Sequence, residues 1–267
     1  MTVGQRTSPS VDATREAAVV PPPVVASGVT KVFGQGAGSV QALDRVSFEV
    51  RQGEFCCLLG ASGCGKSTML NLLAGLDTPT AGSVDVRGRT ALMFQEAALF
   101  PWLTALQNVE LALKLRKVPK AGRRERAREL LESVHLGGFA DRQPHELSGG
   151  MRQRVALARA FAQDADVLLM DEPFGALDAM TRDLLHDELE RLWSERGLTV
   201  VFVTHNVREA ARLGDRVVLL TSRPGRVAEV FPLDLPRPRR LESHEVASAA
   251  ARVTERLRRE VRRHAGD

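Results

Sequence analysis

The sequence predicts an α/β fold in which helices cover a largely parallel sheet, with a pair of antiparallel strands and a helical insertion. Short apolar runs at 54–59, 90–94, 166–170 and 199–204 have the length and composition of strands buried on both faces. Segments with a helical pattern separate these runs, as in α/β proteins. Helix-forming and charged residues dominate 96–154, which predicts a mostly helical insertion.

Length and composition are those of an ordinary globular protein. The 267 residues suffice for one sizeable domain, or for a domain with an inserted subdomain. No apolar run approaches the roughly 20 residues that a membrane helix needs. Residues 1–27 lack the apolar core of a signal peptide, so we expect the chain to serve any membrane from its cytosolic side.

The two ends of the chain differ from its middle. Residues 1–24 are polar and end in three prolines, which predicts a disordered leader. Alternating segments at 29–33 and 46–50 flank a glycine-rich turn and predict a hairpin-like pair of strands. In the tail, 241–267, apolar residues recur every three or four positions between 243 and 263, which predicts an amphipathic helix.

The cysteine content disfavours a disulfide-stabilised protein, and the charge pattern disfavours a nucleic-acid-binding protein. Cys56, Cys57 and Cys64 are too few and too clustered for a disulfide framework; the first two are expected to be buried, whereas an exposed thiol at Cys64 could be alkylated. The net charge is +4, with basic stretches at 114–128 and 237–263. Because no aromatic residues interleave with them, we interpret them as solvated helix faces and expect no nucleic-acid partner.

A glycine-rich loop follows the first apolar run. Gly60-x-x-x-x-Gly65-Lys66-Ser67 fits the phosphate-binding P-loop, in which backbone N–H groups and a helix N-terminus meet phosphate oxygens. Lys66 is expected to neutralise the β- and γ-phosphates and Ser67 to hold Mg²⁺. The alternative, a chance glycine-rich turn, is disfavoured by the strand before it and the helical pattern at 69–76 after it. The predicted nucleotide-binding residues here are Gly60, Ala61, Ser62, Gly63, Cys64, Gly65, Lys66, Ser67 and Thr68.

An apolar strand at 167–170 ends in two carboxylates, Asp171 and Glu172. Strand ends of this kind bind ligands at the carboxyl edge of a parallel sheet. We expect Asp171 to support Mg²⁺ and Glu172 to orient or deprotonate the attacking water. Two acids after an apolar strand are common by themselves, and it is the P-loop in the same chain that gives them weight.

The order of the remaining motifs identifies a family. Gln95 follows a strand, the run LSGGMRQR occupies 147–154, Ala176-Leu177-Asp178 follows the acidic strand, and another strand ends at His205. Alone, Ser-Gly-Gly is only a helix N-cap with permissive glycines. In this order, from about 24 to 263, the chain resembles the ATP-binding proteins of ABC transporters. A P-loop metabolite kinase would have no use for LSGGMRQR.

The resemblance implies a P-loop NTPase (ABC ATPase) core with an antiparallel β subdomain and an inserted α-helical subdomain. It implies an ATPase domain at 25–240 with the helical subdomain at about 97–154. It also implies a head-to-tail homodimer in which each ATP lies between one P-loop and the partner's LSGGMRQR. The implied nucleotide contacts outside the P-loop are Ser148, Gly149 and Gly150 in trans, Gln95, and Asp178 at the dimer seam.

The implied catalytic residues are Glu172, His205, Gln95 and Lys66, with His205 on the γ-phosphate, and the implied metal ligands are Ser67, Gln95 and Asp171. Gln95 would also sense the membrane subunit. Phe33 lies where the family has an aromatic residue stacked on adenine; a strand-end core residue is the alternative. ATP and Mg²⁺ are the implied cofactors.

Within the family, the segments 94–104, 222–226 and 234–239 resemble importers of nitrate, sulfonate, taurine and related small anions, which carry a Pro-Trp-Leu-Thr turn. Trp102 as a core residue and the proline-arginine run as a linker are the alternatives. An importer of a pyrimidine or thiamine precursor, or a non-transport ABC ATPase, are the other functions left open. The importer interpretation implies two permease subunits, indirectly an extracytoplasmic solute-binding protein, and a peripheral location on the cytoplasmic face of the cell membrane.

Overall fold

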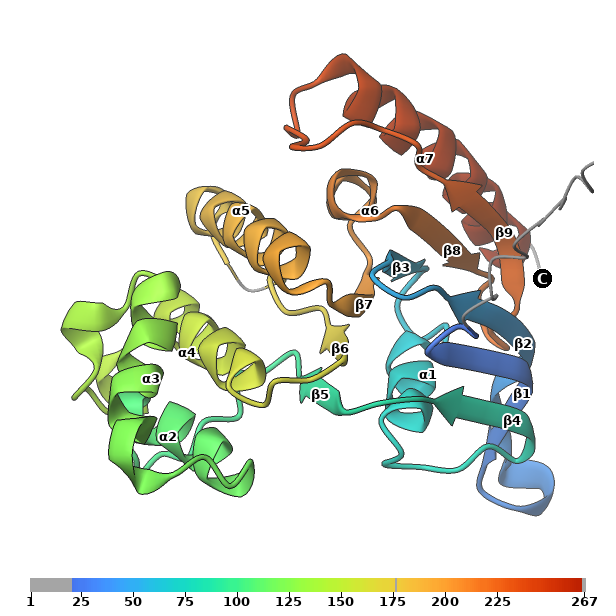
Figure 1. Cartoon of the computed structure of the whole chain (residues 1–267). Coiled ribbons are helices and arrows are strands. Elements are labelled where there is room, and N and C mark those ends of the chain that lie inside the picture. The colour runs from blue at the N-terminus through green and yellow to red at the C-terminus, as the bar shows by residue number, and fades with distance from the viewer. Residues whose placement is uncertain (1–20, 176, 266–267) are drawn as a thin grey trace, which may run out of the picture.

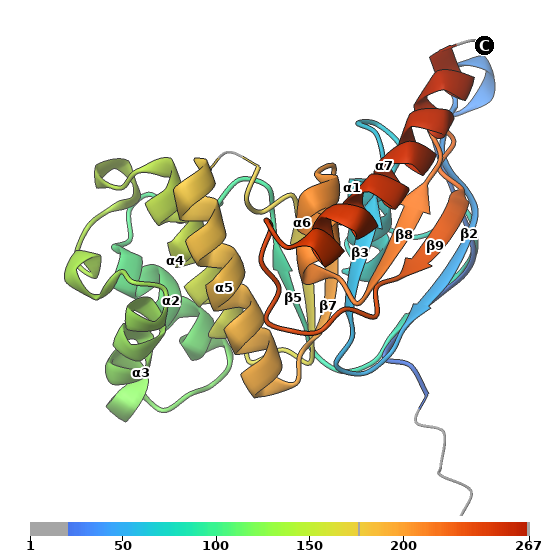
Figure 2. The ribbon, with the colours of Figure 1, turned by 90° about the horizontal axis from the view of Figure 1, so that it is seen from above.

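The computed structural model describes residues 21–175 and 177–265 (Figure 1). The predicted leader up to residue 20, Ala176 and residues 266–267 lie outside the described residues. Val24, which the leader prediction included, already belongs to the first strand. Two sheets and a separate group of helices make up the molecule, and a long carboxyl-terminal helix covers one flank (Figures 1 and 2).

A six-stranded sheet has the order β5-β6-β7-β3-β8-β9, and its strands are parallel except for β9, which is antiparallel to β8. The bounds in that order are β5 Thr90–Met93, β6 Val167–Asp171, β7 Thr199–Thr204, β3 Phe55–Leu59, β8 Arg216–Leu220 and β9 Val227–Pro232. A three-stranded antiparallel sheet has the order β2-β1-β4, with β2 Val40–Val50, β1 Val24–Phe33 and β4 Ala81–Val86. The predicted α/β fold with an antiparallel pair is confirmed.

The helices are α1 Lys66–Leu73, α2 Ala105–Leu115, α3 Lys120–Ser133, α4 Gly149–Phe161, α5 Ala179–Arg196, α6 Val207–Leu213 and α7 His244–Ala265. Short 3₁₀ turns occur at Gly36–Gly38, Gly137–Phe139 and Pro144–Glu146. The helix predicted at 69–76 begins earlier, at Lys66, because Gly65 takes a left-handed conformation (φ +96°) that starts it there.

Apolar side chains pack on both faces of the parallel sheet. Along β3, Phe55 and Cys57 point into a core shared with the helical group, while Cys56 and Leu58 point into a core shared with the antiparallel sheet and α1. This alternation is the two-residue period of a strand buried on both sides. Cys56 and Cys57 are both buried, as the sequence predicts.

The predicted helical insertion consists of α2, α3 and the start of α4, which lie together at one end of the molecule (Figures 1 and 2). Thr104 and Gln107 form a reciprocal capping box that begins α2. The helix α4 continues to Phe161, beyond the predicted limit at 154, so it links the helical group to the strand β6.

The predicted carboxyl-terminal amphipathic helix is confirmed as α7. Val246, Ala250 and Val253 are buried on its inner side, against the body of the protein that includes α6, whereas Val261 is 45% exposed. Within the described ranges, none of the helices has the length and apolar character to cross a membrane.

Candidate functional site

Three loops meet at the carboxyl edge of the parallel sheet because their strands are in register. Leu59 of β3 lies beside Thr204 of β7, and Val203 of β7 lies beside Asp171 of β6. The residues that follow these strand ends are therefore neighbours in space. The P-loop, the acidic pair and His205 follow β3, β6 and β7, so the fold brings together three motifs that are far apart in the sequence.

The P-loop connects β3 to α1, and its glycines are required by geometry. Gly65 has φ +96°, and a Cβ there would lie 2.6 Å from Leu43 Cδ2 and 2.9 Å from the Ala42 carbonyl oxygen. A Cβ on Gly60 would lie 2.6 Å from Cys64 Sγ. Larger residues at either position would clash, so this tight loop depends on both glycines.

The thiol of Cys64 is buried beneath this loop, with only 1% of the residue exposed. Burial raises the pKa of this thiol, against the opposing charge of Lys66. The exposed, readily alkylated thiol considered for this position is therefore wrong. The side chain packs under the loop, and the Cys64 N–H donates to the Ala61 carbonyl at 3.3 Å.

Lys66 is 5% exposed and folds back over its own loop. Its Nζ donates hydrogen bonds to the carbonyl oxygens of Gly60 at 2.9 Å and Ala61 at 3.1 Å. The same Nζ lies 3.8 Å from Glu172 Oε1. The ammonium group thus stands between the loop and the acidic pair, where it can attract an incoming phosphate.

Asp171 has the environment of a cation ligand. Its Oδ1 is buried and finds no hydrogen-bond partner among the described residues. Burial raises the pKa of the Asp171 carboxyl, opposed by a hydrogen bond from the Ser67 side chain and by the charge of Lys66. An orphaned carboxylate oxygen beside a hydroxyl fits Mg²⁺, which binds oxygen ligands. Within the described ranges, no group of three or more His, Cys, Asp and Glu side chains has an arrangement that could hold a metal ion by itself, so an ion at Asp171 would need further ligands from water or phosphate.

Glu172 and His205 form the polar pair at the centre of the site. His205 Nδ1 and Glu172 Oε2 are 2.7 Å apart. Glu172 has φ +42°, a left-handed conformation that is costly for a residue other than glycine and that recurs at functional sites. Its backbone N–H donates to the Val203 carbonyl at 2.9 Å, which fixes this turn to β7. His205 is more than half exposed, with its side chain 57% accessible, and can therefore reach a ligand.

Gln95 is exposed and is tied to the helical group through its backbone. The Gln95 carbonyl oxygen accepts a hydrogen bond from Gln153 Nε2 of α4 at 2.5 Å. Arg159 of α4 donates to the carbonyls of Ala97 at 2.9 Å and Ala98 at 2.7 Å. Three hydrogen bonds therefore tie the loop after β5 to α4, a link for which the sequence offers no local signal.

Ser148, Gly149 and Gly150 form the beginning of α4. Ser148 Oγ accepts from the Met151 N–H at 3.2 Å, so it is an N-cap, and the early N–H groups of this helix lie near an exposed end. A Cβ on Gly150 would lie 3.1 Å from Thr181 Cγ2, which shows how closely α4 approaches the start of α5. There Asp178 caps α5 by accepting from the Thr181 N–H at 2.9 Å.

These residues fall into two groups rather than one. The helix α4 lies on the opposite side of β5 and β6 from α1, the helix that follows the P-loop (Figures 1 and 2). The start of α4 and the P-loop of one chain therefore do not form a single site. Phe33 stands apart at the end of β1, 44% exposed with Lys31 Nζ 5.0 Å from its ring centre, so the core alternative for Phe33 is wrong.

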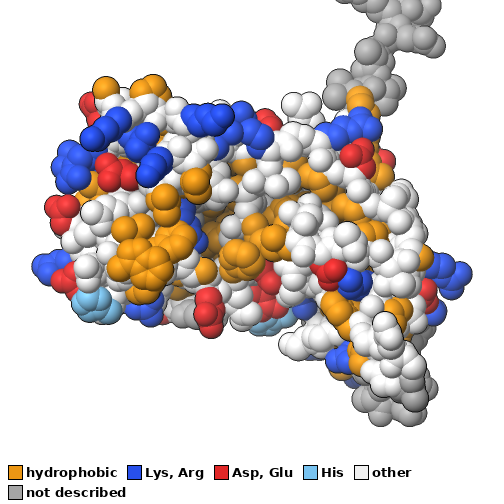
Figure 3. Space-filling model, turned by 90° about the horizontal axis from the view of Figure 1, so that it is seen from below, with side chains coloured by type: hydrophobic (Ala, Val, Ile, Leu, Met, Phe, Trp, Pro, Cys, Tyr) orange, Lys and Arg blue, Asp and Glu red, His pale blue; other side chains and the backbone are white. Residues whose placement is uncertain are grey.

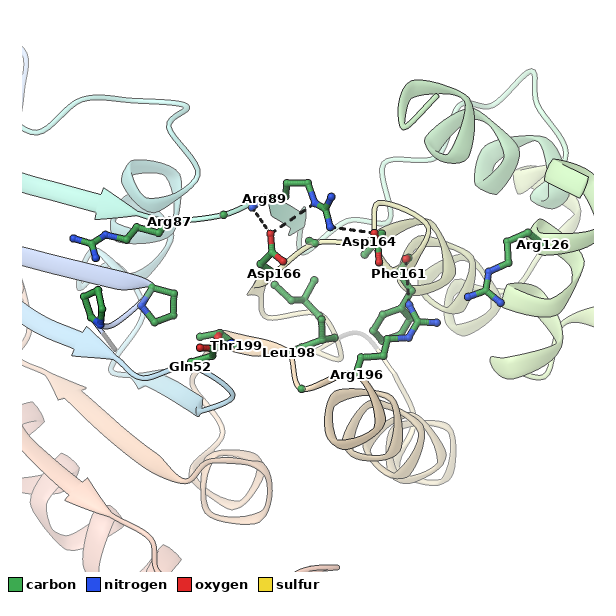
Figure 4. Close-up of a pocket in the computed structure, with 17 residues that line it drawn as sticks. Gln52, Arg87, Arg89, Arg126, Phe161, Asp164, Asp166, Arg196, Leu198 and Thr199 are labelled. Atoms are coloured by element: carbon green, nitrogen blue, oxygen red, sulfur yellow. Dashed lines mark hydrogen bonds and ion pairs between the residues drawn. The ribbon is translucent and has the colours of Figure 1, made fainter. Parts of the chain in front are cut away.

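A pocket of about 730 Å³ lies at the other edge of the parallel sheet, where β6 and β7 begin (Figure 4). Its arginines are largely engaged with neighbours: Arg89 with Asp164 at 3.1 Å, and Arg196 against the ring of Phe161. None of the predicted site residues lines it. The candidate site is instead the carboxyl edge of the parallel sheet, where the motifs meet.

Comparison with known proteins gives matches over most of the chain. The family model described as ABC transporter matches residues 43–175. An aliphatic sulfonates import ATP-binding protein of Bacillus licheniformis is 45% identical over 217 residues, 78% of this chain and 84% of that protein. A bicarbonate transport ATP-binding protein of Synechococcus elongatus is 46% identical over 229 residues, 81% of this chain but 34% of that longer protein. A dimeric ATP-binding cassette in a post-hydrolysis state, bound to ADP and Pi, superposes with a TM-score of 0.73 at 37% identity, covering 80% of this chain and all of that chain.

Proposed function

Because the chain belongs to the ABC transporter family and is an ATP hydrolase of that type, we propose that it powers the import of a small anion such as a sulfonate, nitrate or taurine. The likeness to an aliphatic sulfonates import protein carries this proposal. The bicarbonate transport relative supports the broader class, since bicarbonate is also a small anion. The segment 94–104 resembles that of the small-anion importers. Trp102 in this segment is 69% exposed, which rules out the alternative that it is a core residue.

In the proposed reaction, water attacks the γ-phosphate of ATP and releases ADP and phosphate. Glu172 takes the proton of this water, and His205, whose Nδ1 lies 2.7 Å from Glu172 Oε2, contacts the γ-phosphate. Lys66 turns from its loop carbonyls to the phosphates, and the P-loop N–H groups from Gly60 to Thr68 surround them. The exposed ring of Phe33 stacks on adenine.

Ser67 and Asp171 would hold Mg²⁺, and Gln95 would reach it directly or through water. Bound there, the ion would neutralise charge on the β- and γ-phosphates. The orphaned Asp171 Oδ1 supports this assignment, because it is a buried oxygen in need of a positive partner.

Two copies are needed for complete sites in this proposal. Ser148, Gly149 and Gly150 of one copy would face the P-loop of the other, with Asp178 at the seam between them. The dimeric cassette structures support this arrangement. The positive end of α4 suits a γ-phosphate, since helix N-termini bind anions.

The membrane partners are two permease subunits, which act with an extracytoplasmic solute-binding protein, and the chain would lie on the cytoplasmic face of the membrane. Large exposed apolar side chains follow β5: Phe94, Phe100 and Trp102, with the last two rings 5.6 Å apart. Figure 3 shows one face of the molecule on which hydrophobic side chains gather. Exposed apolar groups of this kind are typical of protein contact surfaces. Gln95 lies in the same loop and would transmit the closure of the dimer to the permease.

Growth on single nutrient sources tests the substrate class. Cells whose only copy carries Glu172→Gln are compared with wild type on taurine, an alkanesulfonate or nitrate. Selective failure on one of these supports import and names the solute class. Normal growth on all of them removes the small-anion assignment, and pyrimidine and thiamine precursors are then tested. Recovery of the chain with a membrane permease separates transport from non-transport roles.

A further inference from the structure

Next to the Glu172–His205 pair, a partly buried ionic contact joins α5 to α6, the helices that follow these two residues in the chain. We propose that Arg182 of α5 and Glu209 of α6 are positioning residues for ATP hydrolysis: together they hold Glu172 and His205 in register. We call Arg182 and Glu209 the clamp. This inference rests on the roles proposed above for Glu172 and His205.

The Arg182 half of the clamp fixes the chain that leaves Glu172. Its Nη2 donates to the Leu177 carbonyl at 2.6 Å, and its Nε donates to the Phe174 carbonyl at 3.3 Å. The Gly175 N–H in turn donates to the Glu172 carbonyl at 3.2 Å. A guanidinium fork that grips two carbonyls of one loop restricts the direction in which this loop can leave β6.

The Glu209 half of the clamp fixes the turn that carries His205. Glu209 Oε1 lies 3.5 Å from Arg182 Nε, and Oε2 accepts from the Thr204 hydroxyl at 2.7 Å. The Thr204 oxygen accepts from the Asn206 N–H at 2.9 Å. Because Thr204 and Asn206 flank His205 on both sides, the Glu209 carboxylate sets the backbone from which the imidazole projects.

The polar partners of Glu209, rather than its burial, hold the pKa of its carboxyl below the usual value. Glu209 is 5% exposed, and burial acts to raise its pKa, but the nearby His186 ring, the hydrogen bond from the Thr204 hydroxyl and the charge of Arg182 lower this pKa below the usual value. His186, which is fully buried on α5, places Nε2 3.7 Å from Glu209 Oε1, longer than a direct hydrogen bond, and its ring meets Phe174 edge-on at 5.2 Å. His186 thus packs against Glu209, in addition to the contacts that Glu209 makes with Arg182 and Thr204.

A small polar cavity connects the clamp with the catalytic pair. About 80 Å³ in volume, it is lined by Glu172, Gly175, Arg182, Thr204, His205, Asn206 and Glu209. This space is polar and large enough to hold water. No apolar layer separates Glu209 from Glu172, so a change in the clamp reaches the pair directly.

A buried ion pair is weak evidence for stability, so the experiment must separate positioning from folding. The chain offers a matched control in Glu190 of α5, which is 8% exposed and pairs with Arg237 at 2.7 Å. Glu190 does not line the cavity at the catalytic pair. Glu209→Gln and Glu190→Gln therefore each neutralise one buried, paired carboxylate.

The measurement is steady-state ATP hydrolysis by the full-length protein with Mg²⁺, beside thermal unfolding of each variant. We expect Glu209→Gln to lower kcat by about 10-fold to 100-fold with KM for ATP unchanged, as misplaced catalytic groups do. Glu190→Gln should lower the melting temperature as much and leave kcat at the wild-type value. Equal kcat in wild type and Glu209→Gln, or equal losses of kcat in Glu209→Gln and Glu190→Gln, would overturn the proposal.

Arg182→Lys serves as a second variant, since it keeps the charge opposite Glu209 but removes the fork on Phe174 and Leu177. Arg182→Lys should also lower kcat and leave KM for ATP unchanged. If Glu209→Gln does not fold, the kcat of Arg182→Lys tests the proposal in its place. Combined with Glu209→Gln, it should add little further loss, because the two residues act as one unit. Losses that multiply would show that they act separately. Native turnover in Glu172→Gln or His205→Ala would instead defeat the proposed catalytic roles, whatever the clamp variants do.

Discussion

The carboxylate of Glu172 is aimed by an unusual backbone rather than by its side chain alone. With φ at +42°, the chain turns sharply where β6 ends, and the side chain meets His205 on one side and Lys66 on the other. This conformation is costly for a residue with a Cβ, so the surrounding contacts must hold it. A site that holds such a carboxylate between an imidazole and an ammonium group is prepared for proton transfer beside a phosphate.

Replacing Glu172 with Gln should slow ATP hydrolysis by about 100-fold or more, since a general base contributes roughly 10²–10⁴-fold. The amide fills the same space but takes no proton, so affinity for ATP should be unchanged and an ATP-bound dimer should accumulate. Phosphate release and equilibrium nucleotide binding measure the two effects. The exposed Glu125→Gln is the control. Hydrolysis at the native rate would assign the base to another group.

Lys66→Ala should weaken nucleotide binding itself. A hydrogen bond to a charged group contributes about 1.5–3 kcal/mol, so affinity for ATP should fall by roughly 10-fold to 100-fold. Titration with a fluorescent ATP analogue measures it, with the exposed Lys120→Ala as the comparison. Normal affinity in Lys66→Ala would count against the P-loop assignment, because no other ammonium group closes this loop among the described residues.

At the scale of elements, Arg239 ties the segment after β9 to the end of α6. The residue is 5% exposed, and its guanidinium donates to the carbonyls of Gly214 at 2.5 Å and Leu233 at 3.0 Å. It also donates to the Ala211 and Arg212 carbonyls in the last turn of α6. A positive group at a helix carboxyl terminus is favourable, and here it also satisfies buried carbonyls.

Arg239→Met should therefore destabilise the protein by about 2–4 kcal/mol, because several buried carbonyls lose their partner. Arg239→Lys should recover only part of this, since one ammonium group lacks the planar fork. Urea unfolding measures both, against Arg240→Met at the exposed neighbouring position. If Arg239→Met and Arg240→Met unfold at the same urea concentration, the hydrogen bonds of Arg239 do not stabilise the protein and the prediction is wrong.

The sequence predicts the elements whose residues form one continuous pattern along the chain. The strand β3, the P-loop and the strand β6 are read from apolar runs and fixed spacings, and the structure has them. The strand β4 was not predicted, because it lies at a sheet edge with most of its residues exposed and carries little apolar alternation. Arg237 and Arg239 lie in a run that is typical of a linker, yet both guanidinium groups reach the body of the protein.

The same contrast holds within the site. Lys66, Asp171 and His205 each belong to a continuous motif, and the register of the sheet brings these motifs together. Arg182 and Glu209 carry no local signal: they are charged residues on two helices, and only the packing of α5 beside α6 reveals their contact. Periodicity likewise shows only the apolar part of α1 and misses its start, which is set by the backbone of Gly65.

At the scale of the whole molecule, the predicted nucleotide contacts lie in two separate parts of the fold. The P-loop precedes α1 on one side of β5 and β6, and Ser148 begins α4 on the other side (Figures 1 and 2). Both ends have free helix N–H groups suited to phosphate. In the proposed head-to-tail dimer, one copy offers one of these ends to a given ATP, and a second copy related by two-fold symmetry would complete both sites at once.

Ser148→Asp tests this division. Aspartate is as good an N-cap as serine, so α4 should still form, but its carboxylate would stand where the partner's γ-phosphate is expected. In a Glu172→Gln background with ATP and Mg²⁺, Ser148→Asp should abolish the dimer seen by size-exclusion chromatography or light scattering. The ATP affinity of the monomer should stay the same, because in the proposed dimer Ser148 contacts the nucleotide of the partner and not that of its own chain.

The matched control is Ser83→Asp, which places the same carboxylate at an exposed position of β4. It should leave the ATP-dependent dimer intact. A dimer that persists in Ser148→Asp would mean that the start of α4 does not lie at the seam. A monomer whose ATP affinity falls in Ser148→Asp would instead mean that Ser148 meets the nucleotide of its own chain, and the head-to-tail arrangement would have to be abandoned.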